Sequence, residues 1–284
     1  MIEIKIKKEL HGSIGIMNLD VDLEIQRKDF IALTGLSGSG KTTFLRSLAG
    51  LEKSQGIIKV ENEIWQDDKT FLPVQKRKIG FVFQDYALFS NMNVLENLLY
   101  VNKDKKLAQK LLEMTDLSAL KNRLTNSLSG GQKQRVSLCR SMMNKPKLLL
   151  MDEPLSALDP SMRIKLQNEI LELHQEFETT TIMVSHDPSE IYKLSNRVIV
   201  LKDGKIIDDG KAKNVLLKTN GSAKFSFDGK IIDIIKVDVI CVAIVAIGQQ
   251  LVEVTISSLE AKELKIGQEV LVSTKAFAPS IKKK

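Results

Sequence analysis

The stretch that decides the fold is GLSGSGKT at residues 35–42, which comes just after the apolar run FIAL at residues 30–33. It matches G-x-x-x-x-G-K-[ST] between a buried strand and a helix, where glycines let successive backbone N–H groups point at one anion. Lys41 can reach the β- and γ-phosphates of a nucleotide, and the Thr42 hydroxyl can ligate Mg²⁺. A plain Gly/Ser-rich connection explains the match poorly. The residues predicted to bind the nucleotide are Gly35, Leu36, Ser37, Gly38, Ser39, Gly40, Lys41, Thr42 and Thr43.

A second signal is the apolar run LLLM at residues 148–151, which is followed by Asp152 and Glu153. A buried strand carries its last side chains to the edge of an α/β sheet where ligands bind. At that edge Asp152 can hold Mg²⁺ through water, and Glu153 can accept a proton from an attacking water. Alone, this pattern is more often a surface turn. Behind a phosphate loop, it indicates a catalytic site.

The pentapeptide LSGGQ at residues 128–132 opens a second predicted helix, residues 132–144. A Ser hydroxyl and Gly N–H groups at the positive end of a helix form an anion site. In isolation the motif could be an N-cap with flexible glycines. A chain with one complete phosphate loop needs no second site for the same nucleotide. We therefore expect Ser129, Gly130, Gly131 and Gln132 to contact a nucleotide held by another copy, in a homodimer.

A guanine-specific enzyme is rejected. NKPK at residues 144–147 resembles the guanine-reading Asn-Lys-x-Asp, but it lacks the Asp and lies before the acidic strand.

The composition is that of a soluble globular protein, with 43% hydrophobic and 27% charged residues among 284. No apolar run approaches the ~18–20 residues of a membrane span. The net charge of +7 is scattered, so a solvated surface is favoured over nucleic-acid binding. Cys139 and Cys241 form no metal pair or disulfide framework. The start of the chain has no signal-peptide core, and cytosol is the expected compartment.

Strands alternate with helices through most of the chain, which predicts a parallel sheet covered on both faces. Leucines at helical spacing place a helical insertion within residues 93–145. Near residues 219–222 the composition shifts to turn formers, and only short Ile- and Val-rich strands follow. These strands predict a separate small β barrel. The expected domains are 1–220, with a helical subdomain at about 88–145, and 221–284.

Six motifs in this order resemble the nucleotide-binding subunit of an ATP-binding-cassette (ABC) transporter. They are the phosphate loop, Gln84 after FVF, LSGGQ, the acidic strand, SALD at 156–159 and His186 within VSHD. The resemblance covers residues 1–220. It implies a P-loop NTPase fold with a helical subdomain and a small C-terminal all-β, oligomer-binding-like domain of the TOBE/Mop type. It also implies ATP with Mg²⁺ and transmembrane permease subunits. A solute-binding protein outside the cell would be an indirect partner, and the chain would lie peripherally on the cytoplasmic face of the membrane.

By the same resemblance, Gln84 would touch Mg²⁺ or the attacking water and relay the nucleotide state to the membrane subunit. His186 would contact the γ-phosphate, and Asp159 would help to pair the protomers. The family usually places an aromatic ring near residues 10–16 to stack on adenine. Residues 8–16 contain no Phe, Tyr or Trp, and His11 supplies the one ring. This departure puts strict adenine preference in doubt.

Residues 72–89 are similar to importers of molybdate, sulfate, iron and polyamines, and residues 257–277 are close to a molybdate-binding module. Molybdate or tungstate is the preferred solute, with sulfate, iron or polyamine as alternatives. The candidate oxyanion ligands are Ser257, Ser258, Ser273, Thr274 and Lys275. The favoured alternative for this tail is that it binds nothing and enlarges the dimer interface. A DNA-repair or chromosome ATPase is disfavoured because the sequence lacks long coiled coils and zinc-ligating cysteines. An exporter is disfavoured because exporters usually lack a β tail like residues 222–280.

Overall fold

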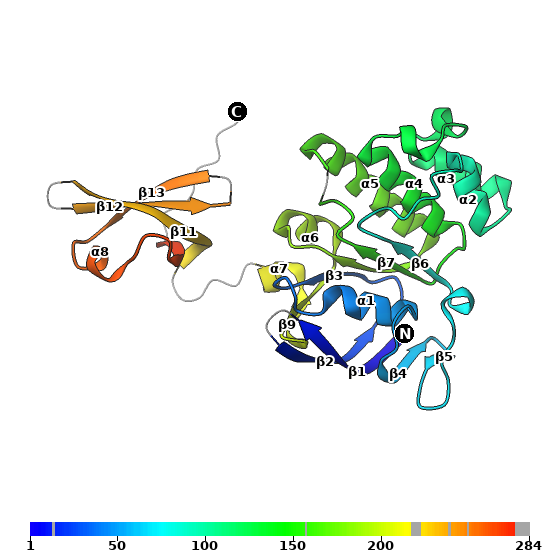
Figure 1. The fold of residues 1–284 in the computed structure, drawn as a ribbon, viewed down its shortest axis with the longest axis horizontal. Coiled ribbons are helices and arrows are strands. Elements are labelled where there is room, and N and C mark those ends of the chain that lie inside the picture. Colours follow the sequence, from blue (N-terminus) through cyan, green and yellow to red (C-terminus); the bar gives the residue numbers. More distant parts are fainter. Residues whose placement is uncertain (13–14, 157, 217–222, 238–239, 249, 276–284) are drawn as a thin grey trace. The chain divides into compact units, whose positions relative to one another are not determined.

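The computed structural model describes residues 1–12, 15–156, 158–216, 223–237, 240–248 and 250–275. The chain divides into two compact units, Met1–Leu216 and Leu217–Lys284. Each unit is described by itself (Figure 1). In the described part of the chain, no helix combines the length and apolarity needed to span a membrane.

The first unit is built on a ten-stranded sheet in the order β5-β4-β1-β2-β10-β9-β3-β8-β7-β6. The strands β9, β3, β8, β7 and β6 pair in parallel, whereas β1, β2, β4 and β5 form an antiparallel flank. The strand bounds are β1 Ile2–Gly12, β2 Gly15–Ile25, β3 Phe30–Thr34, β4 Gln55–Val60, β5 Glu63–Gln66, β6 Ile79–Val82, β7 Leu148–Asp152, β8 Thr180–Val184, β9 Arg197–Lys202 and β10 Lys205–Lys211.

Helices cover both faces of the parallel half, as the strand β7 shows. Its five residues are all buried. Leu148 and Leu150 join the core beneath α1 (Lys41–Ala49), while Leu149 and Met151 join the core beneath α4 (Gly130–Met142) and α5 (Pro160–Phe177). Successive side chains of a strand point to opposite faces, so a strand that is apolar throughout needs cover on both sides. The predicted α/β sheet with two covered faces is therefore confirmed.

The helices of the first unit are α1 Lys41–Ala49, α2 Val94–Val101, α3 Lys105–Met114, α4 Gly130–Met142, α5 Pro160–Phe177, α6 Pro188–Leu194 and α7 Ala212–Leu216. Short 3-10 turns lie at Val74–Lys76, Ser118–Leu120 and Thr125–Ser127. The helices α2, α3 and α4 lie between β6 and β7 in sequence and gather together in Figure 1. Their shared core contains Leu98, Leu107, Leu111, Leu112 and Val136.

The structure corrects one predicted helix in this unit and adds two elements that the sequence analysis did not include. The helix after the LSGGQ motif starts at Gly130 and ends at Met142, whereas the sequence predicted residues 132–144. The reason is that Ser129 is its N-cap, which places both glycines in the first turn. The sequence also missed the strand β10, which pairs antiparallel with β9, and the short helix α7.

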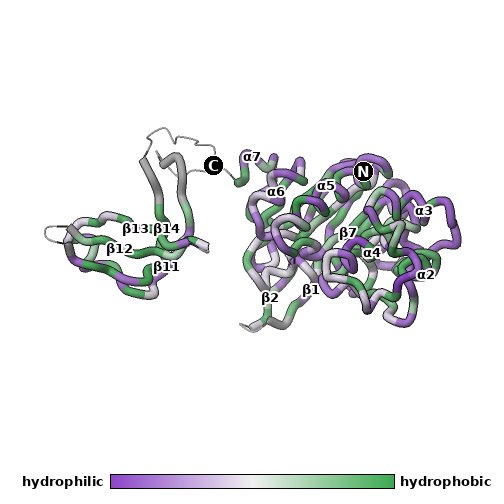
Figure 2. Tube along the Cα trace, turned by 90° about the horizontal axis from the view of Figure 1, so that it is seen from above, coloured by the Kyte–Doolittle hydropathy of each residue, from purple (hydrophilic) through white to green (hydrophobic). Residues whose placement is uncertain are grey.

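The second unit contains a four-stranded antiparallel sheet in the order β13-β12-β11-β14. Its elements are β11 Ala223–Val237, β12 Ile240–Ile247, β13 Gln250–Ile256, α8 Glu260–Glu263 and β14 Glu269–Lys275. Figure 2 shows hydrophobic stretches along these strands between hydrophilic ones. Ile231, Ala243 and Val245 are the buried centre. The all-β character agrees with the sequence, and closure into an oligomer-binding-like barrel stays a prediction. Residues 219–222, where the composition shifts, lie outside the described residues.

Candidate functional site

The phosphate loop between β3 and α1 takes a backbone conformation that only glycine accepts without strain. Gly35, Gly38 and Gly40 have φ angles of 141°, 79° and 99°. A Cβ on Gly35 would lie 2.0 Å from the carbonyl oxygen of Leu201, so this position has no room for a side chain. Helix α1 starts without a side-chain cap. Its first N–H groups are therefore available to an anion such as phosphate.

Lys41 follows the loop and folds back over it. Its Nζ donates hydrogen bonds of 2.8 Å to the carbonyl oxygens of Gly35 and Leu36. Burial lowers the pKa of Lys41, while the carboxylates of Glu153 and Asp152 act in the opposite direction. The ammonium thus stands in the loop as a positive charge next to two acids, which suits it to neutralise phosphate oxygens.

Thr42 and Asp152 supply oxygen ligands from two distant parts of the chain. The Thr42 hydroxyl donates to Asp152 Oδ1 at 3.3 Å. Burial raises the pKa of Asp152, whose exposed fraction is 8%. Magnesium binds hard oxygen ligands, commonly one or two carboxylates together with substrate phosphates. The described residues offer no group of three or more His, Cys, Asp or Glu for a metal. The pair therefore fits Mg²⁺ that is bound together with a nucleotide.

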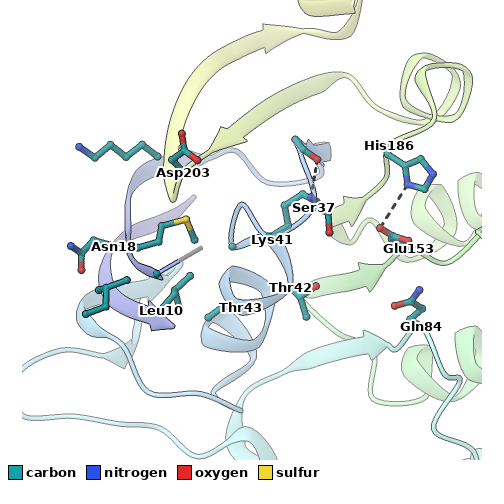
Figure 3. A pocket seen from close by; sticks show the side chains of 17 residues that line it. Leu10, Asn18, Ser37, Lys41, Thr42, Thr43, Gln84, Glu153, His186 and Asp203 are labelled. Carbon is teal, nitrogen blue, oxygen red and sulfur yellow. Dashed lines mark hydrogen bonds and ion pairs between the residues drawn. The ribbon is translucent and has the colours of Figure 1, made fainter. Parts of the chain in front are cut away.

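Glu153 comes directly after this strand and takes a left-handed backbone conformation, with φ 46°. Such a conformation is uncommon outside glycine. Its Oε1 lies 3.7 Å from Nδ1 of His186, which follows β8, as the dashed line in Figure 3 shows. Gln84, after β6, lines the same cavity of about 1120 Å³. Three loops at the carboxyl edge of the sheet thus meet around one space.

Most of the predicted loop residues line the same cavity, namely Gly35, Ser37, Gly38, Gly40, Lys41, Thr42 and Thr43. Leu36 and Ser39 are not among its lining residues: Leu36 is 73% exposed and Ser39 is buried within the loop at 4%.

The far end of the cavity has an aliphatic wall that sequence reasoning missed. Leu10 and Met17 are register partners on β1 and β2. Both side chains would contact a Cβ on Gly40, with Leu10 Cδ1 at 3.2 Å and Met17 Cε at 3.6 Å. Asp203, from the turn before β10, also lines the space (Figure 3). The side chain of His11 lies outside the described residues. Neither aliphatic residue carries a motif that could have identified it.

Ser129 and Gln132 form a capping box at the start of α4. Ser129 Oγ accepts from the backbone N–H of Gln132, whose side chain accepts from the N–H of Ser129. None of Ser129, Gly130, Gly131 or Gln132 is among the described residues that line the cavity of the phosphate loop. The expectation that they contact a nucleotide held by another copy stays a prediction.

Asp159 is the N-cap of α5. Its Oδ1 accepts from the backbone N–H groups of Ser161 and Met162 at 3.1 and 3.0 Å. Hydrogen bonds, above all that from the Ser161 hydroxyl, lower the pKa of Asp159. The carboxylate therefore has a structural task in the protomer, and its role in pairing protomers stays a prediction.

Of the candidate oxyanion ligands, Ser257 has an acidic neighbour. Its hydroxyl and backbone N–H donate to Glu260 Oε2 at 2.7 and 2.8 Å. The side chains of Ser273, Thr274 and Lys275 lie outside the described residues. An oxyanion site in the second unit stays a prediction.

Comparisons with known proteins agree with this geometry. A family model described as "ABC transporter" matches residues 19–156. The chain is 42% identical over 224 residues to the sulfate/thiosulfate import ATP-binding protein CysA 1 of Agrobacterium fabrum (strain C58 / ATCC 33970), covering 74% of this chain and 64% of that protein. It is 40% identical over 215 residues to the molybdenum import ATP-binding protein ModC of Saccharophagus degradans (strain 2-40 / ATCC 43961 / DSM 17024), covering 73% and 59%. The chain thus spans about three fifths of the length of these curated relatives.

A solved structure is also similar. It is the dimeric structure of a post-hydrolysis state of the ATP-binding cassette MJ0796 bound to ADP and Pi. The TM-score is 0.65 at 31% sequence identity, and the match covers 75% of this chain and 99% of that one.

Proposed function

This chain belongs to the ABC transporter family, and we propose that it is the ATP-hydrolysing subunit of an importer. The observation that carries the proposal is the meeting of two contacts at one edge of the sheet. The Thr42 hydroxyl lies 3.3 Å from Asp152, and Glu153 lies 3.7 Å from His186. The first contact is suited to bind Mg²⁺ with nucleotide phosphates, and the second to handle a water molecule and its proton.

The chain binds ATP through the phosphate loop, whose backbone N–H groups and Lys41 neutralise the phosphate charge. Thr42 and Asp152 would hold Mg²⁺, with Gln84 close by in the cavity. The ion supplies charge neutralisation of the phosphate oxygens when it is bound. Preorganised charges of this kind stabilise the transition state of phosphoryl transfer without a covalent step.

Glu153 acts as the general base of hydrolysis. Its carboxylate accepts the proton of the attacking water at Oε1, next to His186. A hydrogen bond from Ser156 Oγ to the Glu153 carbonyl at 3.0 Å supports the turn, in which Glu153 has a φ of 46°. The side chain of His186 is 69% exposed, so it can reach the terminal phosphate from the open side of the cavity.

A second copy completes the site. The N-terminus of α4, with Ser129 and two glycines, presents an anion site outside the cavity of its own chain. The similarity to a cassette solved as a dimer with ADP and Pi supports a nucleotide held between two copies. Membrane-embedded permease subunits are the proposed partners, with the chain placed peripherally on the cytoplasmic side.

For the transported solute we favour molybdate or tungstate. The similarity of residues 257–277 to a molybdate module and the match to a molybdenum import protein support this choice. The match to a sulfate/thiosulfate import protein supports sulfate as the alternative. Stimulation of ATPase activity in lipid, with the co-purified permease and receptor, discriminates between these oxyanions. Stimulation by a polyamine or iron alone would contradict the oxyanion assignment.

The substitution Glu153→Gln tests the hydrolytic function. It keeps the size of the side chain but removes the base, so we expect ATP turnover to fall by about 10²–10⁴-fold. Equilibrium ATP binding should persist, because the loop and Lys41 are unchanged. The matched control is Glu178→Gln, since Glu178 also has a left-handed backbone, φ 49°, but caps α5 away from the cavity. Normal turnover by Glu153→Gln would contradict the proposal.

A further inference from the structure

Arg163, on the first turn of α5, joins two segments of the chain, the turn at Leu158 and the start of α6 at Asp187 and Glu190. Its Nη1 donates to Asp187 Oδ2 at 3.1 Å, and its Nε lies 3.4 Å from Glu190 Oε1. Its Nη2 donates to the carbonyl oxygen of Leu158 at 3.5 Å. One guanidinium therefore connects the turn before α5 to both ends of the first turn of α6.

The acidic partners of Arg163 leave it little freedom to move. The side chain of Glu190 is 6% exposed, and burial raises its pKa. A buried carboxylate needs a paired charge and hydrogen bonds. Arg163 supplies the paired charge for Glu190, and the hydroxyl of Ser185 supplies a hydrogen bond, donating at 2.7 Å. The guanidinium is planar and can serve both acids at once, which a lysine ammonium cannot do with the same geometry.

This network holds the residues that flank His186, which faces Glu153. The backbone N–H of Asp187 donates to Ser185 Oγ at 3.1 Å, so the residues on both sides of His186 are fixed. A small cavity of about 50 Å³ behind the site is lined by Glu153, Ser156, Arg163, Ser185, His186 and Glu190, among others. In Figure 3 a dashed line joins the ring of His186 to Glu153.

We propose that Arg163 is a positioning residue that holds His186 against Glu153 and couples this pair to the turn that ends in Leu158 and Asp159. Asp159 is the N-cap of α5, and the N–H of Arg163 donates to its carbonyl oxygen at 2.9 Å. A displacement of this turn, such as contact with a second copy would cause, would therefore be passed by one side chain to Asp187, the neighbour of His186. The inference rests on the proposed ATPase function.

The test uses the full chain with Arg163→Met and Arg163→Lys. Loss of the guanidinium should lower kcat for ATP by about tenfold or more, since small displacements of catalytic groups have large effects on rate. The KM for ATP should stay within about twofold, because the phosphate loop is untouched. Arg163→Lys should recover part of kcat. The matched control is Lys165→Met, which removes an exposed ion pair with Asp116 from the same helix and should leave kcat unchanged.

A second readout does not depend on turnover. The chain has three histidines, so the imidazole NMR signal of His186 is assigned with His186→Gln. We expect this signal to shift in Arg163→Met and to stay in place in Lys165→Met. If Arg163→Met fails to fold, Asp187→Asn replaces it, because Asn still caps α6 but carries no charge for Arg163.

Three results would overturn the inference: wild-type kcat in Arg163→Met, an unmoved His186 signal, or a fall in kcat matched by an equal loss of ATP affinity. Failure of the proposed function is a different outcome, namely no ATP hydrolysis by the unsubstituted chain. In that case the His186 signal alone decides whether Arg163 positions the ring.

Discussion

Replacement of Arg77 by Met removes a positive charge from the interior of the first unit. The side chain of Arg77 lies between α1 and the segment before β6 and is 1% exposed. It donates to the carbonyl oxygens of Leu72, Ser47, Leu48 and Trp65 at 2.8, 3.2, 2.7 and 3.2 Å. Burial lowers its pKa to about 10, so it stays charged at neutral pH. We expect a strong loss of stability from this substitution.

The magnitude follows from the groups that Arg77 satisfies. The Ser47 carbonyl also accepts from the N–H of Gly50 at 3.0 Å, and the Trp65 carbonyl accepts from the N–H of Leu72 at 2.8 Å. The carbonyl groups of Leu48, in the last turn of α1, and of Leu72 are therefore the two that lose their partner. A buried polar group that loses its partner costs about 1–3 kcal/mol. Met offsets part of the cost of the unpaired carbonyl groups, because its side chain is uncharged and no charge has to be buried. We therefore expect a net loss of about 3–5 kcal/mol. At about 2–4 °C per kcal/mol for a unit of this size, Tm should fall by about 6–20 °C.

The single tryptophan gives a direct assay. Trp65 is fully buried, and its ring centroid lies 5.6 Å from the Arg77 guanidinium. Urea unfolding followed by its fluorescence thus reports on this part of the first unit. The control is Arg27→Met, which removes an exposed ion pair with Glu61 and should cost at most about 1 kcal/mol. If Arg77→Met stays within about 1 kcal/mol of the unsubstituted chain, the reasoning on buried carbonyl groups is refuted.

Two further predictions concern the loop and a buried acid. Gly35→Ala should abolish ATP binding in a binding titration, since its Cβ would lie 2.0 Å from the Leu201 carbonyl oxygen. Gly38→Ala should bind ATP more weakly than the unsubstituted chain but measurably, because its Cβ would have nothing within 4 Å. Equal ATP affinities of the two variants would contradict this difference. Glu169, paired with Arg135 at 3.0 Å, has a pKa raised by burial to about 7. The folded state therefore holds this proton more tightly, and the stability gained below pH ~4.5 is lost as pH rises through ~7. Between pH 5 and 8, Glu169→Gln should reduce the decline in the free energy of unfolding, measured with urea, by about 2–3 kcal/mol. An unchanged decline would contradict the role of Glu169.

Much of the first unit could be predicted because its signals are local. The phosphate loop requires glycines at positions 35, 38 and 40 of one short loop, and β7 is recognised from five consecutive apolar or acidic residues. The strand β10 was not predicted because the sequence KIIDDGK alternates only weakly between apolar and polar residues and about half of its residues are charged. It is a strand because β9 offers it an antiparallel edge, which is a long-range property.

The candidate site was predictable in its motif residues but not in its supports. Arg163 and Leu10 belong to no motif, and nothing in their neighbourhoods distinguishes them from other helix and strand residues. The importance of Arg163 comes from its contact with Asp187, which lies 24 positions away along the chain. Leu10 gains its place from Met17, across a strand pair whose connecting residues 13 and 14 lie outside the described residues.

The sequence by itself determined that the chain carries a phosphate loop, an acidic strand and a parallel sheet covered on both faces. These properties depend on backbone freedom, apolar periodicity and charge within short windows. Only the tertiary structure decided which of these segments meet. Thr42 and Asp152 are 110 positions apart, yet their oxygens lie 3.3 Å from each other. Such a contact exists because β3, β8 and β7 align their carboxyl ends at one edge, and this alignment depends on packing across the whole sheet.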